Sequence, residues 1–235
     1  MSKGKLFLIP NLLAPDSIPS VLPCNIKETV DQIEYFFAED LRTGRRFLSE
    51  LKVSKRIEEL KFYKVDKDTS AEEIRTYFAE IPKEENIGVL SEAGCPCIAD
   101  PGSVAVYEAH KLGMQVVPLV GPSSILLALM ASGLNGQSFV FLGYLPIDKE
   151  ARSKAIRTIE KESLQKNQTQ IFIETPYRNN KLIEEILRVC NPGTKLCMAS
   201  NLTASNQVIA MKTIKEWKER LPDLDKQPAI FLLLG

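Results

Sequence analysis

Short apolar runs alternate with amphipathic stretches along most of this chain. Where apolar residues step by three or four positions, as Ile74, Phe78 and Ile81 do, they form one face of a helix. Strands that alternate with helices predict βαβ units and therefore a parallel sheet. Nine apolar runs are predicted as strands: residues 6–9, 62–65, 87–90, 116–119, 139–142, 170–173, 196–199, 208–211 and 230–234.

The helices are predicted from apolar spacing and from residues that begin or end a helix. A helix is expected over residues 26–37, where Ile26, Val30, Ile33 and Phe37 share one face. Another follows Ser103, with Ser103 as its N-cap and Gly113 at its left-handed end. A third opens at residues 122–124 and closes at Gly133, and a charged helix begins within residues 145–154.

The second half of the chain holds more strands than helices. Residues 196–199 and 208–211 are close enough to pair through a short loop. At 235 residues the chain can hold two modest domains. We therefore expect two α/β domains, residues 1–119 with a mostly parallel sheet and residues 120–235 with a mixed sheet.

Two of the predicted strands run into loops of unusually small residues. The segments at residues 87–102 and 115–124 each begin with an apolar run and end in Gly, Pro, Ser and Ala. Small side chains let main-chain N–H and C=O groups contact a ligand directly. Open α/β sheets bind ligands at the carboxyl ends of their strands. The sequence therefore predicts an active site built on these two loops.

Charge and cysteine content restrict the classes of partner and compartment. With 30 basic and 30 acidic residues, the chain has no overall attraction to nucleic acid or to an anionic membrane. Residues 42–56 are locally basic and could contact phosphates, although a solvated helix face explains these charges equally well. No apolar run approaches the roughly 20 residues that cross a bilayer. Five cysteines without an apolar leader favour a reducing cytoplasm and no disulfide bond.

The residues that several common kinds of catalytic or cofactor site require do not occur in this sequence in the required pattern. His110 is the only histidine and falls inside a predicted helix, which disfavours a histidine triad or a histidine-rich metal site. Cys95 and Cys97 form a single C-x-C, which does not imply a metal. The chain has no G-x-x-x-x-G-K-[ST] and no G-x-G-x-x-G after its first strand, so ATP, NAD and FAD are disfavoured. S-adenosylmethionine remains a cofactor that suits loops of small residues.

Several segments together carry a resemblance to a known family. Residues 90–102, 116–124, 131–134 and 139–146 resemble the tetrapyrrole methylase superfamily. Within it they are most similar to the branch that methylates a ribose 2′-hydroxyl of small-subunit ribosomal RNA, whose typical wording is S-D-A-G-T-P-x-I-x-D-P-G, P-x-P-G-P and S-G-L. Residues 38–44 are similar to the A-E-D-T-R motif of that branch, and residues 173–178 to its Y-E-S-x-x-R.

The resemblance implies two α/β domains with S-adenosylmethionine in the cleft between them, and a homodimer in the cytoplasm. It implies ribosomal RNA or the small ribosomal subunit as partner, and neither a membrane nor a metal. The implied cofactor-binding residues are Ser91, Glu92, Ala93, Gly94, Asp100, Pro101, Gly102, Ser123, Ser124, Met198, Ala199 and Pro228. If the acceptor is a ribose hydroxyl, its high pKa calls for a base or a nearby cation, and the candidates are Glu39, Asp40, Arg42, Glu174 and Arg178.

The chain also departs from the pattern of that branch. The usual T-P-I-G-N-L loop survives only in fragments at residues 9–16, and Glu92 stands where the pattern has an aspartate. In the segment that is usually R-E-x-T-K, Asn201 replaces a carboxylate and Ala204 a lysine. Three interpretations therefore stay open: an RNA ribose methyltransferase, a methyltransferase acting on a small molecule such as a tetrapyrrole, and a cofactor-binding module without catalysis.

Overall fold

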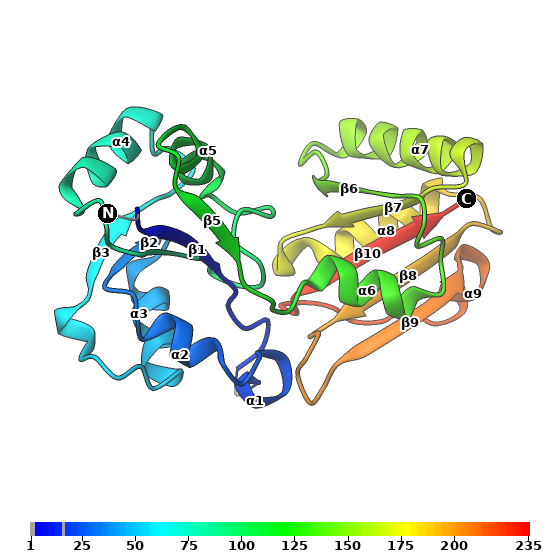
Figure 1. The fold of residues 1–235 in the computed structure, drawn as a ribbon. Helices are drawn as coiled ribbons and strands as arrows, with labels where there is room; N and C mark the ends of the chain where they lie inside the picture. Colours follow the sequence, from blue (N-terminus) through cyan, green and yellow to red (C-terminus); the bar gives the residue numbers. More distant parts are fainter. Residues whose placement is uncertain (1–2, 16) are drawn as a thin grey trace. The chain divides into compact units, whose positions relative to one another are not determined.

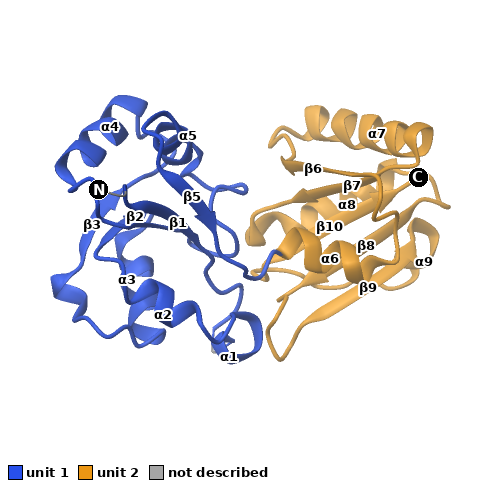
Figure 2. Ribbon diagram, in the orientation of Figure 1, with its two compact units in different colours: residues 1–123 blue, residues 124–235 orange. Residues whose placement is uncertain are grey.

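A computed structural model of the chain describes residues 3–15 and 17–235. The chain divides into two compact units, unit 1 (Met1–Ser123) and unit 2 (Ser124–Gly235), which are coloured separately in Figure 2. Each unit contains a sheet of five strands with helices packed against it.

The sheet of unit 1 is parallel throughout and is covered on both faces. Its order is β3-β2-β4-β1-β5. Apolar residues of α1, α2 and α3 fill one core layer, and those of α4 and α5 fill the other (Figure 1). A parallel sheet that is buried on both faces favours strands of continuous apolar sequence. The strands are β1 (Lys5–Ile9), β2 (Tyr35–Ala38), β3 (Lys61–Lys64), β4 (Ile87–Leu90) and β5 (Gln115–Pro118), and the helices are α1 (Ile18–Val21), α2 (Ile26–Val30), α3 (Leu41–Glu50), η1 (Ile57–Glu59), α4 (Ala71–Glu80) and α5 (Ser103–Lys111).

The sheet of unit 2 is mixed, in the order β6-β7-β10-β8-β9. Only β6 and β7 run parallel, and the other neighbours are antiparallel. Its core is centred on the stacked rings of Phe172 and Phe231, 5.9 Å apart. The predicted α/β fold, with a parallel first sheet and a mixed second sheet, is confirmed. The elements are α6 (Ser124–Ser132), β6 (Phe139–Tyr144), α7 (Lys149–Lys166), β7 (Thr169–Ile173), η2 (Pro176–Arg178), α8 (Asn179–Val189), β8 (Lys195–Ser200), β9 (Val208–Thr213), α9 (Ile214–Glu219) and β10 (Ala229–Leu234).

The helix predicted over residues 26–37 is wrong in its second half. Helix α2 ends at Val30, and Tyr35–Ala38 forms strand β2. Phe36 and Phe37 are both fully buried, and they belong to the two different core layers of unit 1. Side chains that alternate between two buried layers are a property of a strand, and the aromatic residues here favour one.

The helix ends agree with the sequence in part. Ser103 is not the N-cap of α5, because Gly102 occupies that position with a φ of +119°, a conformation that suits a residue without a side chain. Gly113 and Gly133 have φ of +65° and +68°, so both take the left-handed conformation predicted for helix ends.

Candidate functional site

Three loops follow neighbouring strands of unit 1 at the same edge of the sheet. We call them the β1 loop (residues 10–15), the β4 loop (residues 91–102) and the β5 loop (residues 119–123). Because β4, β1 and β5 are adjacent and parallel, their carboxyl ends bring these loops together. The two loops predicted to build the active site are the β4 and β5 loops.

Asn11 fastens the β1 loop to the β4 loop. Its Nδ2 donates to the carbonyl oxygens of Ser91 and Glu92, at 3.0 and 3.1 Å. Its main chain exchanges two hydrogen bonds with Gly94, of 2.8 and 3.1 Å. Asn11 is only 5% exposed, so these bonds hold the two loops as one layer. Asn11 was not among the predicted site residues, and the signal available in the sequence was a polar residue two positions after the end of a strand.

The β5 loop packs closely against both other loops. A Cβ placed on Gly121 would lie 2.2 Å from Cγ of Pro10, so the backbone can approach the β1 loop only because residue 121 is glycine. Cys95 Sγ donates to the carbonyl oxygen of Pro122 at 3.5 Å. Gly94 has a φ of +73°, and its Cβ position would lie 3.4 Å from the same oxygen. The structure therefore brings the β4 and β5 loops into contact.

Burial and nearby negative charge disfavour the charged forms of two carboxyl groups, Asp100 and Glu39, at this edge of the sheet. Burial, followed by the negative charges of Glu39 and Glu92, raises the pKa of Asp100 to about 7. Burial and the charge of Glu92 also raise the pKa of Glu39 above its usual value. One oxygen of Asp100, Oδ2, is buried without a hydrogen-bond partner. This edge therefore holds a carboxyl group that exchanges its proton near neutral pH and a buried acceptor oxygen that receives no hydrogen bond from the protein.

The two cysteines of the β4 loop are poor candidates for thiolate chemistry. Burial and then the negative charge of Asp100 raise the pKa of Cys97 to about 11, and burial also raises the pKa of Cys95. Both groups are therefore neutral thiols near pH 7. All five cysteines of the chain are free. Within residues 3–15 and 17–235, no three His, Cys, Asp or Glu side chains are grouped so as to hold a metal ion.

Asp40 and Arg42 lie where helix α3 begins. Asp40 is its N-cap, and its Oδ1 accepts from the main-chain N–H of Thr43 at 2.6 Å. That hydrogen bond lowers the pKa of Asp40. Arg42 is exposed in the first turn of the helix. The cap gives Asp40 a structural role beside the catalytic role that the sequence suggests for it.

Glu174 and Arg178 form an ion pair with each other in unit 2. Oε1 of Glu174 accepts from Nε and Nη2 of Arg178, at 2.9 and 2.6 Å, and from the main-chain N–H of Thr175 at 2.6 Å. Glu174 is 5% exposed, and its second oxygen, Oε2, is buried without a partner. Glu174 follows β7 directly, and Arg178 is the last residue of η2.

The other predicted residues of unit 2 lie on β8, beside β10 and at the start of α6. Met198 and Ala199 are buried on β8, and Met198 packs in the core around Phe172 and Phe231. The carbonyl oxygen of Pro228 accepts from the main-chain N–H of Asn201 at 3.0 Å. Ser124 is the first residue of α6, while Ser123 ends unit 1. The predicted cofactor residues are thus divided between the two units.

Asn201, which replaces a carboxylate of the family pattern, fixes the loop after β8. Its Nδ2 donates to Oε1 of Gln227 at 2.8 Å, and its main-chain carbonyl accepts from the N–H of Ala204 at 3.0 Å. With a φ of +51°, Asn201 holds a left-handed conformation that asparagine tolerates better than most residues. This substitution therefore has a clear structural role.

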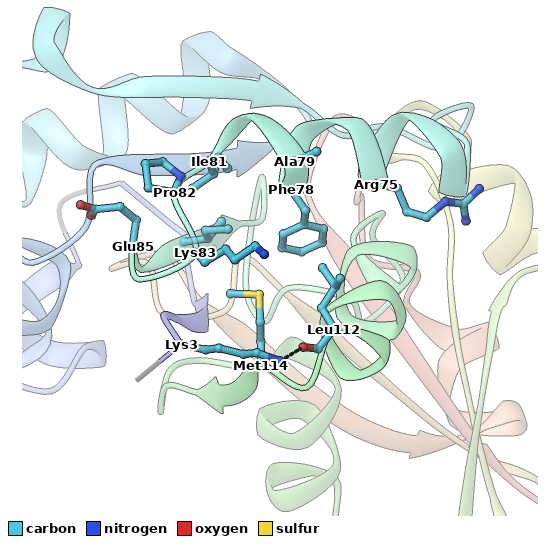
Figure 3. A pocket seen from close by; sticks show the side chains of 11 residues that line it. Lys3, Arg75, Phe78, Ala79, Ile81, Pro82, Lys83, Glu85, Leu112 and Met114 are labelled. Atoms are coloured by element: carbon cyan, nitrogen blue, oxygen red, sulfur yellow. Dashed lines mark hydrogen bonds between the residues drawn. The ribbon is translucent and has the colours of Figure 1, made fainter. Parts of the chain in front are cut away.

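A separate cavity of about 360 Å³ lies at the opposite edge of the unit 1 sheet, where the strands begin (Figure 3). Phe78, Ile81 and Met114 give it apolar walls, and Arg75 and Lys83 lie at its border. It shares no residue with the three loops. Among the described residues, no helix is both long and apolar enough to span a membrane.

Comparison with known proteins adds a family to this geometry. The model of the family described as tetrapyrrole (corrin/porphyrin) methylases matches residues 25–218. A protein of Haemophilus influenzae named ribosomal RNA small subunit methyltransferase I is 29% identical over 211 residues, which cover 88% of this chain and 71% of that protein. The protein of the same name from Escherichia coli O157:H7 is 28% identical over 88% of this chain and 68% of its own length.

Two solved structures share the fold at low sequence identity. The methyltransferase CobJ gives a TM-score of 0.63 at 15% identity, with 99% of this chain and 94% of that chain covered. A uroporphyrin-III-C-methyltransferase from Thermus thermophilus gives 0.54 at 17% identity, with 99% and 93% covered. The resemblance predicted from the sequence motifs is confirmed by these comparisons.

Proposed function

Since this chain belongs to the family of tetrapyrrole (corrin/porphyrin) methylases and is a methyltransferase, we propose that it transfers a methyl group from S-adenosylmethionine to a ribose 2′-hydroxyl of small-subunit ribosomal RNA. The observation that carries this substrate is the similarity to relatives named for ribosomal RNA, at 28–29% identity over 88% of the chain. The solved tetrapyrrole-type enzymes are more distant in sequence, at 15–17%.

The residues of the β1, β4 and β5 loops suit S-adenosylmethionine. Asp100 Oδ2 is a buried acceptor without a partner, and it can receive a hydrogen bond from an amino or hydroxyl group of the donor. Glu92 is exposed in the same loop and can accept from another such group. Gly94 and Gly121 let the three loops pack closely against one another. We propose the same role, contact with S-adenosylmethionine, for the remaining cofactor residues predicted from the sequence.

When bound, the donor supplies a methyl group that its sulfonium charge has already activated. The protein then has to align the acceptor oxygen, exclude water and receive a proton. Of the five predicted catalytic residues, Glu39 is the best candidate to receive the proton, because the charges of Glu92 and Asp100 act on the same part of the site. We assign proton acceptance to Glu39 and Asp100, and contacts with the acceptor to Asp40 and Arg42 in the same unit.

The proposed assembly is a homodimer of two-domain chains in the cytoplasm, with domains 1–119 and 120–235. Support for the dimer comes from exposed apolar side chains on three elements of unit 2. Met130 on α6 is 80% exposed, Tyr144 on β6 is 58% exposed and Met211 on β9 is 42% exposed. Large apolar side chains that stay exposed on one unit favour association with another protein surface.

The second candidate is methyl transfer to a tetrapyrrole, which the fold shared with the uroporphyrin-III-C-methyltransferase favours. One assay separates the two functions. The chain is incubated with labelled S-adenosylmethionine and either small ribosomal subunits that lack the modification, subunits that already carry it, or uroporphyrinogen. We expect label in the RNA of the unmodified subunits alone. Label in the tetrapyrrole, or no label in any acceptor, would contradict the proposal.

A further inference from the structure

A cavity of about 260 Å³ lies in unit 1 between the β1 loop, helix α3 and the β4 loop. It shares Glu92 and Ala93 with the loop that we assign to the methyl donor, and its far side is helix α3. The cavity has the size of a single nucleotide rather than of a tetrapyrrole. Its position places any ligand beside the proposed reaction site, and apart from Glu92 and Ala93 its lining residues are ones that the family resemblance did not assign.

The cavity is apolar at its base and polar at its border. Leu12 and Phe47, which are 9% and 2% exposed, give it apolar contact surface. Thr43, Arg46 and Glu92 contribute a hydroxyl, a guanidinium and a carboxylate at the border. A nucleotide has the matching distribution, because its base has two flat apolar faces, its edges and ribose carry hydrogen-bonding groups, and its phosphate is an anion.

Arg46 is the cation of this cavity, and it is only weakly engaged. Its side chain is 72% exposed, and its Nε lies 3.7 Å from Oε1 of Glu50. An exposed ion pair at that distance contributes little, so the guanidinium can turn to a phosphate at small cost. Arg42 and Arg45 are exposed on the same helix, four and one positions before it. Arg42 lies one helical turn before Arg46 and shares its face of helix α3, so two cations lie on this side of the helix beside the carboxylates of Glu50 and Glu92. Arg45 instead lies over the ring of Phe62, with its Cζ 5.1 Å from the ring centroid.

The bottom of the cavity is also rigid. Asn11 lines it and ties the β1 loop to the β4 loop through its side chain and its main chain. The main-chain N–H of Thr43 is held by the Asp40 cap. A cavity whose walls are fixed before binding loses little entropy when a ligand enters.

We infer that this cavity binds one unstacked nucleotide of the RNA substrate, with the phosphate on Arg46 and the base against Leu12 and Phe47. This inference rests on the proposed function and deepens it, because it names the surface that selects single-stranded RNA next to the reacting ribose. Glu92 then lies between the donor loop and the nucleotide, where it can accept a hydrogen bond from a ribose hydroxyl or from an exocyclic amino group.

The test compares three variants of the full chain. Arg46→Ala removes the phosphate contact, and Thr43→Phe narrows the cavity without changing its charge. The matched control is Arg75→Ala, because Arg75 is an exposed arginine that contacts Glu108 at 3.5 Å and borders the other cavity (Figure 3). Affinity for a single-stranded RNA oligonucleotide is measured at several salt concentrations, with affinity for S-adenosylmethionine and thermal stability measured alongside.

We expect Arg46→Ala to weaken RNA binding about tenfold and to reduce the slope of log K against log salt by about one. Thr43→Phe should weaken binding to a similar extent and leave the salt slope unchanged. Arg75→Ala should behave as the unmodified chain, and all variants should keep their donor affinity. Equal RNA affinities for Arg46→Ala and Arg75→Ala would overturn the inference.

The outcomes also separate this inference from the proposed function. If the unmodified chain methylates ribosomal RNA while the Arg46 and Thr43 variants bind RNA normally, the proposed function stands and the nucleotide cavity does not. If the variants lose RNA affinity as expected but no methyl transfer to RNA occurs, the cavity stands and the proposed reaction fails. If the unmodified chain does not bind RNA at any salt concentration, both are wrong.

Discussion

Asp100 combines partial burial with two carboxyl neighbours, Glu39 and Glu92, and this combination makes its ionisation costly. Its pKa is about 7 in the folded chain and 3.8 as the ordinary value. A raised folded pKa means that the folded state holds the proton more tightly than the unfolded state does. The stability that this group contributes is therefore present below about pH 4 and is lost as the pH rises to about 7.

Replacing Asp100 by asparagine should remove this loss of stability at rising pH, because asparagine does not ionise. Between pH 5 and pH 8, we expect Asp100→Asn to lose about 1 kcal/mol less of its free energy of unfolding than the unmodified chain does. The difference stays this small because solvent partly screens a half-exposed carboxyl group. Urea unfolding at the two pH values measures the difference. Asp68→Asn serves as control, since Asp68 is an exposed aspartate. An identical pH response of the Asp100 variant and the unmodified chain would show that Asp100 ionises freely.

The Asn11 side chain joins the β1 loop to the β4 loop, so we expect its loss to affect both loops. Asn11→Ala leaves the carbonyl oxygens of Ser91 and Glu92 without their donor, and we expect a loss of about 2 kcal/mol in the free energy of unfolding. S-adenosylmethionine affinity should fall as well. Asn86→Ala is the matched control, because Asn86 makes one exposed hydrogen bond, to the main-chain N–H of Lys5. A variant as stable as this control would contradict the role of Asn11.

Helix α3 begins at Asp40, which is both its N-cap and a predicted catalytic residue. Asp40→Asn and Asp40→Ala distinguish these roles, because asparagine caps a helix well but carries no charge. We expect Asp40→Asn to keep the melting temperature and Asp40→Ala to lower it. If the charge of Asp40 takes part in methyl transfer, both variants lose activity. Full activity in Asp40→Asn would restrict Asp40 to capping.

Most helices and strands were predictable from the sequence, including β4, which is buried on both faces, but strand β2 was not. Amphipathic spacing gave α4 and the apolar runs gave β4 and β7, because each pattern has a single structural interpretation. Strand β2 follows directly on a helical pattern, and its Phe37 also fits that helical spacing. Burial between two helical layers decides in favour of the strand, and that burial depends on β3 and β4, which come later in the chain.

The candidate site was also predictable only in part. The small-residue loops after β4 and β5 could be predicted, because glycine and proline at strand ends have a local meaning. The contacts that organise them, from Asn11 to Ser91 and from Gly121 to Pro10, join residues far apart in the sequence. No spacing rule relates such partners. The charge coupling of Glu39, Glu92 and Asp100 depends on sheet order in the same way.

For the chain as a whole, the exposed apolar side chains of unit 2 give the proposed dimer a direct test. We expect Met130→Lys to convert the dimer to a monomer, because a charge at an apolar interface is costly to bury. Light scattering coupled to size-exclusion chromatography measures the mass. Leu164→Lys on α7 is the matched control, since Leu164 is 67% exposed, and it should stay dimeric. A monomeric unmodified chain, or a dimeric Met130 variant, would contradict the proposed interface.

Strand β1 lies between β4 and β5, which begin only at Ile87 and Gln115. During synthesis, β1 leaves the ribosome before both of its neighbours, and buried residues such as Leu6 and Ile9 stay uncovered in that interval. The nascent chain is accordingly a candidate client for chaperones that shield apolar segments. Nascent chains stalled at Glu80 should remain sensitive to protease along their first strand, and resistance should arise only after Pro118 has emerged.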